Sequence, residues 1–143
     1  MDALETLSKV PLFEGISEKH LKSLAKWTTT RRWDAGQTIV TEGQTGLGLY
    51  CIQSGTVRVS KAGPNGDLEL RTMGSGESFG ELALLDDKPR SATVTAVEPT
   101  TAVLLDKSQF RAELRSHPEV ALPILETIVG WLREADARAS KYS

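Results

Sequence analysis

The chain has 143 residues, enough for one domain with a single hydrophobic core. Its 17 basic and 19 acidic residues leave a formal net charge of −2, so overall charge gives no drive toward nucleic acid or an anionic membrane surface. The one cysteine, Cys51, excludes an intrachain disulfide, and its apolar neighbours predict a small core residue rather than a reactive thiol. Since no signal peptide or apolar run of spanning length occurs, we expect a cytoplasmic protein without membrane or direct nucleic-acid partners.

Residues 1–27 predict an N-terminal helical segment. Ser17 can act as an N-cap, and Ile16, Leu21 and Leu24 recur around it at helical spacing. We expect this helix to pack against the rest of a single domain that spans residues 1–143.

Residues 28–106 change to short stretches rich in Val, Ile, Thr and Leu, which alternate with glycine-bearing turns. The stretches 56–60 and 93–97 alternate with a period of two, which is typical of strands with one buried face. About eight such strands would form a small jelly roll, in which two sheets fold together and hide most strand edges. The sequence therefore predicts a mainly β fold, a double-stranded β-helix barrel, with helices at both ends.

The most informative segment is residues 79–94, FGELALLDDKPRSATV. Glu81 can accept from a sugar hydroxyl, and Arg90 offers a planar fork of donors to a phosphate. Gly80 allows close approach of the main chain, and a helical turn after it would leave backbone N–H groups free for an anion. The segment predicts a site for a ligand that carries both a sugar and a phosphate.

Residues 107–143 predict a short helix that ends near His117 and Pro118, followed by a longer helix. Apolar residues on the longer helix recur at alternating steps of four and three, at Ala121, Leu125, Ile128, Leu132, Ala135 and Ala139. This spacing is typical of a coiled-coil seam, and packing of the same stripe on the barrel is the alternative. A second apolar stripe (Val120, Ile124 and Trp131) lies beside the first, so one flank of the helix could cover the barrel while the other meets a partner helix. We therefore expect a homodimer through this helix.

The order Phe-Gly-Glu-Leu-Ala-Leu, a short gap and Pro-Arg-Ser-Ala-Thr-Val closely resembles the phosphate-binding cassette of cyclic nucleotide-binding domains. The family includes proteins like the catabolite activator protein and protein kinase A regulatory subunits, and the resemblance extends from Val10 to Arg138. It implies the same double-sheet barrel and a sensor that relays ligand binding by movement of the C-terminal helix. The implied ligand is cyclic AMP, with a cyclic GMP-selective sensor as the alternative, and the implied effector is an unidentified protein or domain.

The resemblance carries roles to the matching positions of this sequence. Glu81 would bind the ribose 2′-hydroxyl, and Arg90 would pair with the exocyclic oxygens of the cyclic phosphate. The Ser91 hydroxyl and the N–H groups of Leu82, Ala83 and Ala92 would complete the phosphate shell beside Gly80.

Base recognition has fewer matching residues. Val59 and Arg71 are expected on barrel strands near the base, where Arg71 could stack on it or reach a ring acceptor. Relatives of the catabolite activator protein bind adenine through a Thr-Ser pair on the long helix, and here Ala135 and Asp136 stand in its place. Asp136 could accept from guanine or be solvated. Trp131 or Leu132 could instead cap the base, as bulky side chains do in several eukaryotic members.

Two other functions are compatible with a barrel of this kind. A cupin-type enzyme would hold a metal through histidines inside the barrel, but His20 and His117 are the only histidines and both fall in the helical flanks. We therefore expect neither that metal site nor catalysis. A degenerate domain that serves only as a dimerising scaffold would typically lack Glu81 or Arg90, and both are present.

Overall fold

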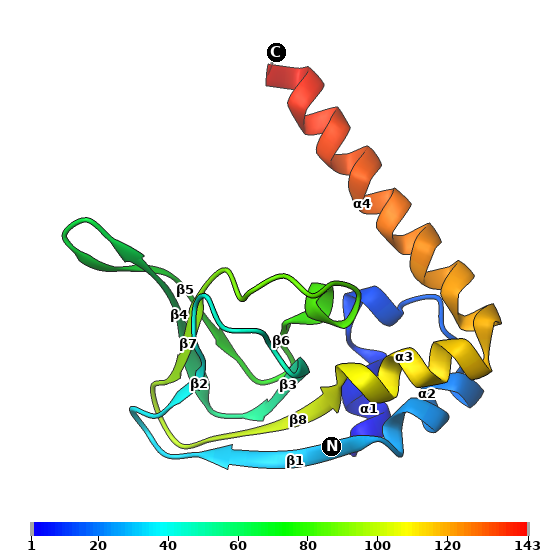
Figure 1. The fold of residues 1–143 in the computed structure, drawn as a ribbon, viewed down its shortest axis with the longest axis horizontal. Helices are drawn as coiled ribbons and strands as arrows, with labels where there is room; N and C mark the ends of the chain where they lie inside the picture. The colour runs from blue at the N-terminus through cyan, green and yellow to red at the C-terminus, as the bar shows by residue number, and fades with distance from the viewer. Residues whose placement is uncertain (1, 143) are drawn as a thin grey trace.

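The computed structural model describes residues 2–142, with side chains through residue 139 (Figure 1). Its strands are β1 (Thr28–Trp33), β2 (Thr38–Val40), β3 (Gly48–Ser54), β4 (Thr56–Gly63), β5 (Gly66–Gly74), β6 (Ser78–Phe79), β7 (Thr93–Ala96) and β8 (Thr100–Asp106). Its helices are α1 (Ala3–Ser8), η1 (Pro11–Phe13), α2 (Glu18–Ala25), η2 (Glu81–Leu84), α3 (Lys107–Ser116), η3 (Pro118–Val120) and α4 (Ala121–Tyr142), where η marks a 3-10 helix.

The strands form two antiparallel four-stranded sheets, one in the order β1-β8-β3-β6 and the other in the order β2-β7-β4-β5. Helices from both ends of the chain gather at one side of the sheets, and α4 extends away from them (Figure 1). This arrangement confirms the predicted mainly β jelly roll with flanking helices. Among residues 2–142, no helix combines the length and apolarity that a membrane span requires.

Side-chain caps set the starts of the helices. Ser17 caps α2 as predicted, because its hydroxyl accepts from the His20 backbone N–H at 3.5 Å. Asp2 likewise caps α1, which lies in the predicted N-terminal helical segment but for which the sequence indicated no separate start and end. Six residues are too few for a stable isolated helix, so α1 depends on tertiary packing, in which Leu7 is fully buried.

The core has two parts, which lie on the two faces of the β1-β8-β3-β6 sheet. Leu49 and Cys51 of β3 face the helices, where Phe13 and Phe110 stack with ring centroids 5.8 Å apart. Tyr50 and its alternate neighbours face the other sheet instead. Burial, aided by the charge of Glu81, raises the pKa of Cys51 to about 12, so this residue is the core thiol that was predicted.

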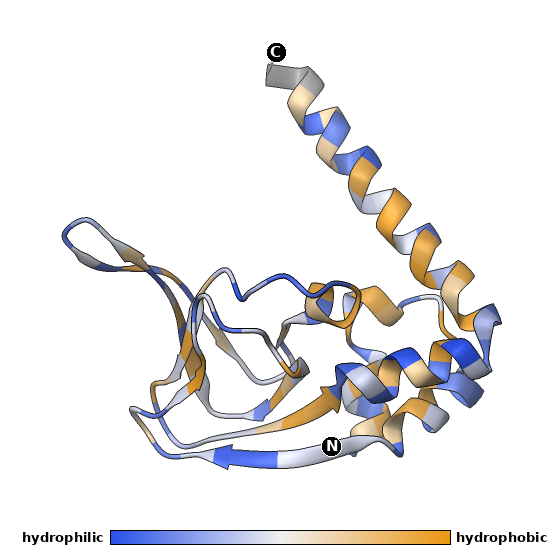
Figure 2. Cartoon of the chain, viewed as in Figure 1, coloured by the Kyte–Doolittle hydropathy of each residue, from blue (hydrophilic) through white to orange (hydrophobic). Residues whose placement is uncertain are grey.

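The structure of α4 agrees with only part of the predicted coiled-coil seam. Val120 and Ile124 are buried, and both Ile128 and Trp131 pack against the same core, so Ile128 does not belong to a free face. The large exposed hydrophobic residues in the part of α4 whose side chains are described are Leu122, Leu125, Val129 and Leu132. Figure 2 shows that such residues recur along the part of the helix that stands clear of the sheets. The exposed apolar stripe is therefore rotated around the helix from the predicted one, because Ile128 of the predicted stripe packs against the core.

Candidate functional site

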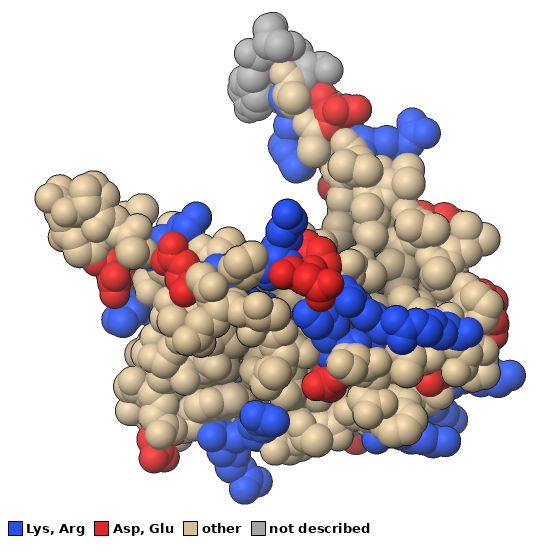
Figure 3. Space-filling model, viewed as in Figure 1, with Lys and Arg blue, Asp and Glu red and all other residues tan. Residues whose placement is uncertain are grey.

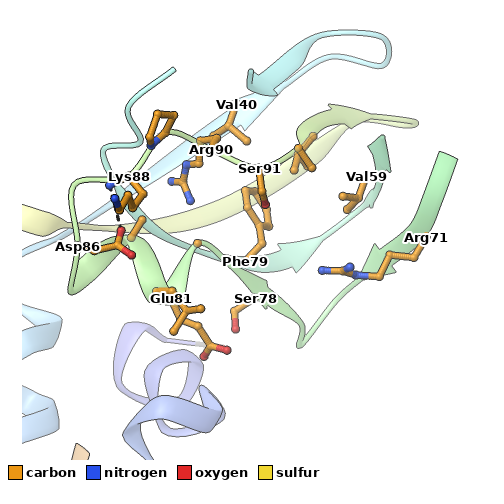
Figure 4. A pocket seen from close by; sticks show the side chains of 16 residues that line it. Val40, Val59, Arg71, Ser78, Phe79, Glu81, Asp86, Lys88, Arg90 and Ser91 are labelled. Atoms are coloured by element: carbon orange, nitrogen blue, oxygen red, sulfur yellow. Dashed lines mark hydrogen bonds between the residues drawn. The ribbon is translucent and has the colours of Figure 1, made fainter. Parts of the chain in front are cut away.

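A cavity of about 420 Å³ lies between the segment 79–94 and strands β2, β4, β5 and β7 (Figure 4). This volume falls in the range of small-molecule sites, roughly 300–1,000 Å³. The predicted site residues that line it are Val59, Arg71, Gly80, Glu81, Leu82, Ala83, Arg90, Ser91 and Ala92. The structure therefore brings the predicted phosphate, ribose and strand residues to one cavity.

The predicted residues of α4 do not line this cavity. Trp131 is half-buried against the helical core, whereas Leu132, Ala135 and Asp136 are exposed on the part of α4 that extends away from the sheets. Their contact with a base stays a prediction that requires a different position of α4, or a second copy of the chain.

Several lining residues were not singled out from the sequence. They are Val40, Ser78, Phe79, Asp86, Lys88, Pro89 and Val94. Phe79, Asp86, Lys88, Pro89 and Val94 lie within the segment 79–94, so proximity in sequence was a signal for them. Nothing in the alternation of β2 and β6 indicates that Val40 and Ser78 face a ligand cavity rather than the core.

Arg90 is fixed in the cavity wall. Its Nη2 donates to the Gly48 carbonyl oxygen at 2.7 Å, and its guanidinium carbon lies 5.9 Å from the Tyr50 ring centroid. Its Nε is buried and has no hydrogen-bond partner among residues 2–142. Burial lowers the pKa of Arg90, while interaction with Tyr50 raises it. The site therefore holds a partly desolvated cation with an unused donor, which suits an anion.

Two glycines make room for this guanidinium. A Cβ at Gly46 would overlap the guanidinium, and one at Gly80 would overlap Arg90 and also lie 2.6 Å from the Gly48 carbonyl oxygen. Gly80 has a φ of +84°, in the left-handed region that disfavours other residues. Both space and backbone conformation thus require glycine directly before η2.

Glu81, the first residue of η2, does not pair with Arg90. Its carboxylate points away from that guanidinium and toward the N-terminal helical segment (Figure 4). Burial raises the pKa of Glu81, and a hydrogen bond from the Leu12 backbone N–H opposes this effect. Oε2 is buried without a hydrogen-bond partner in the part of the chain that the structure describes. The carboxylate therefore retains acceptor capacity for a ligand hydroxyl.

The loop after η2 is tied to α3. Asp87 accepts from Lys107 Nζ at 3.0 Å and pairs with Arg111 Nη1 at 3.3 Å. The hydrogen bond from Lys107, followed by the charge of Arg111, lowers the pKa of Asp87. Arg111 Nε also donates to the Leu84 carbonyl oxygen at 3.1 Å. Figure 3 shows basic side chains over α3 that meet acidic ones of this loop, so the cavity wall is connected to the helix that leads toward α4.

Known proteins with similar sequences bear on this cavity. Residues 30–117 match the family model described as the cyclic nucleotide-binding domain. A CRP-like cAMP-activated global transcriptional regulator from Mycobacterium tuberculosis is 30% identical over 133 residues, which are 92% of this chain and 59% of that protein. The cyclic AMP receptor protein of Thermus thermophilus is 35% identical over 127 residues, 88% of this chain and 59% of that protein. The chain thus spans less than two thirds of the length of these relatives.

A solved structure agrees with these sequence matches. The N-terminal domain of a transcriptional regulator from Streptomyces coelicolor A3(2) superposes with a TM-score of 0.86 at 29% identity and covers 94% of both chains. The family model takes in the segment 79–94 and the strands β4, β5 and β7 that line the cavity with it. With the cavity, the segment and the fold in agreement, the chain belongs to the cyclic nucleotide-binding domain family.

Proposed function

We propose that this chain is a sensor domain that binds cyclic AMP in the cavity beside η2, and that it binds its ligand without catalysis. The observation that carries the proposal is Arg90, a partly desolvated guanidinium whose buried Nε has no partner among the described residues. An uncompensated cation is costly to bury, and a phosphodiester with one negative charge would offset that cost. The relatives from Mycobacterium tuberculosis and Thermus thermophilus are named for cyclic AMP, which supports this choice of ligand.

The phosphate and the ribose would be bound by different parts of the segment. Arg90, the Ser91 hydroxyl and the backbone N–H groups of Leu82 and Ala92 would hold the phosphate. The Ala83 N–H donates to the Gly80 carbonyl oxygen at 3.0 Å, so it would contribute only by sharing that hydrogen bond. Glu81 would turn from the N-terminal segment to accept from the ribose 2′-hydroxyl, using the oxygen that has no partner within residues 2–142.

The base would lie toward β4 and β5. Val59 and Arg71 are directly opposed in the register of these two strands, and both line the cavity. The Arg71 guanidinium is directed into the cavity (Figure 4), where it could stack on a base or donate to a ring acceptor. Neither contact by itself separates cyclic AMP from cyclic GMP.

The signal would pass through Glu81. Its carboxylate holds the Leu12 backbone N–H of η1, and η1 contacts α4. If Glu81 turns to the ribose, η1 loses this acceptor, and the position of α4 that depends on η1 is no longer favoured. The pairs from Asp87 to Lys107 and Arg111 offer a second connection, through α3.

The partner of α4 would be a second copy of this chain. Leu122, Leu125, Val129 and Leu132 follow alternating steps of three and four and are exposed, which is the pattern of a coiled-coil seam. The receiver of the signal would be a separate protein or a further domain, without direct contact of these residues with nucleic acid.

Calorimetric titration with cyclic AMP and cyclic GMP tests the proposal, after the chain has been unfolded and refolded to remove any carried-over nucleotide. We expect saturable binding of one cyclic AMP per chain and weaker binding of cyclic GMP. Preferential binding of cyclic GMP would show that the chain is a sensor for cyclic GMP rather than for cyclic AMP. If the folded chain binds neither nucleotide, the sensor function is wrong and a dimerising scaffold without a ligand becomes the better interpretation.

A further inference from the structure

A cluster of metal-binding side chains lies outside the nucleotide cavity, among the helices. It consists of His20 in α2, His117 between α3 and η3, and Glu119 in η3. One ligand atom from each residue lies within 4.8 Å of those of the other two. His20 is far in sequence from His117 and Glu119, so only the packing of α2 against α3 brings it to the other two (Figure 1).

The two spacings between Glu119 and the histidines match those of a tetrahedral metal site, and the third, between the histidine nitrogens, lies within 4.8 Å. Glu119 Oε1 lies 3.5 Å from His20 Nε2 and also 3.5 Å from His117 Nδ1. Zinc binds histidine nitrogen and carboxylate oxygen at about 2.0–2.2 Å, which separates neighbouring tetrahedral ligands by roughly 3.3–3.5 Å. Imidazole and carboxylate together are donors that suit Zn²⁺ and related divalent transition metals.

A buried carboxylate behind His117 provides an independent observation. The Glu113 side chain is only 8% exposed, and its Oε1 has no hydrogen-bond partner among residues 2–142. This oxygen lies 3.9 Å from His117 Nε2, the ring nitrogen that does not face Glu119. Metal-binding histidines commonly donate their second N–H to a carboxylate, which fixes the tautomer and strengthens the ligand. Glu113 stands where such a positioning carboxylate is needed.

We propose that His20 Nε2, His117 Nδ1 and the Glu119 carboxylate bind one divalent transition-metal ion, with Zn²⁺ as the best match, and that Glu113 orients His117. Water would supply the fourth ligand. The ion would fasten α2 to the junction of α3 and η3, immediately before α4 begins at Ala121. Cys51 is not a competing ligand, because it is buried and its pKa of about 12 keeps it a thiol.

The test is a titration of the untagged, metal-free full chain with Zn²⁺ against a chromophoric chelator, because a histidine tag would itself bind the ion. We expect one Zn²⁺ per chain and a higher Tm when the ion is present. Replacement of a direct ligand in His20→Gln or His117→Gln should weaken binding by more than about a hundredfold, beyond the 10- to 100-fold effects of outer-shell residues. Glu18→Gln, on the same helix as His20 and with an exposed side chain, should bind Zn²⁺ like the parent chain.

Circular dichroism establishes that each variant is folded. If either histidine variant fails to fold, Glu119→Gln is measured in its place, since this side chain is 59% exposed and contributes little to packing. It should bind Zn²⁺ more weakly than the Glu18→Gln control, and equal affinity would overturn the proposal. Absence of saturable Zn²⁺ binding would overturn the proposal. It would also be overturned if folded His20→Gln and His117→Gln bound Zn²⁺ as tightly as the Glu18→Gln control. The readout involves no nucleotide, so it is independent of the function of the cavity.

Discussion

Replacement of Arg90 by alanine isolates the contact that should dominate ligand affinity. Nη2 of Arg90 donates one of its two N–H groups to Gly48 O at 2.7 Å, so its second N–H and those of Nη1 form the edge that remains for a phosphate, besides the buried Nε. Two hydrogen bonds to a charged group contribute about 1.5–3 kcal/mol each. Their loss, about 3–6 kcal/mol in sum, corresponds to an affinity for cyclic AMP that is about 10²- to 10⁴-fold lower.

Calorimetric titration measures this loss, and two further variants make the result specific. Arg90→Lys keeps the charge but not the planar fork, so its affinity should fall between those of the parent chain and Arg90→Ala. Arg115→Ala removes an exposed arginine from α3 and should bind like the parent chain. If folded Arg90→Ala binds cyclic AMP within about threefold of the parent chain, less than about 1 kcal/mol, then Arg90 is not the phosphate contact.

Three further predictions concern the wall of the cavity and α4. Burial raises the folded pKa of Glu81 above its unfolded value, so its contribution to stability is present below the unfolded pKa and is lost as pH rises through the folded one. Glu81→Gln should remove this part of the pH dependence of Tm in the ligand-free chain. If the curves of Tm against pH were parallel for the parent chain and Glu81→Gln, Glu81 would make no such contribution. Gly76 and Gly80 both have positive φ, but only a Cβ at Gly80 meets other atoms. In urea unfolding Gly76→Ala should therefore cost about 1–2 kcal/mol and Gly80→Ala a further 1–3 kcal/mol, and equal costs would show that the space around Gly80 is not limiting. In sedimentation, Leu132→Asp should convert a dimer to a monomer, whereas Leu68→Asp, at a β5 residue of similar exposure, should leave the dimer intact. If the parent chain itself sediments as a monomer, the exposed stripe of α4 is not a dimer interface.

Local sequence was sufficient where the interacting residues are neighbours in the chain. The segment 79–94 contains the glycine, the carboxylate and the guanidinium within one turn and loop, so their roles could be proposed before the structure was known. The same holds for the Ser17 cap of α2 and for the alternation within β4. In contrast, the bounds of α1 within the predicted N-terminal helical segment could not be predicted, because its stability comes from the burial of Leu7 rather than from its own six residues.

Composition, alternation and one contiguous motif thus determined the class of fold, the family and the position of the cavity wall. Tertiary packing alone decided that Ile128 turns to the core, that Glu81 points to Leu12, and that Trp131 lies apart from the cavity. It also brought His20 of α2 next to His117. The physical reason is that orientation and long-range proximity depend on which surfaces pack together, and a periodic pattern in one segment does not identify the surface it will meet.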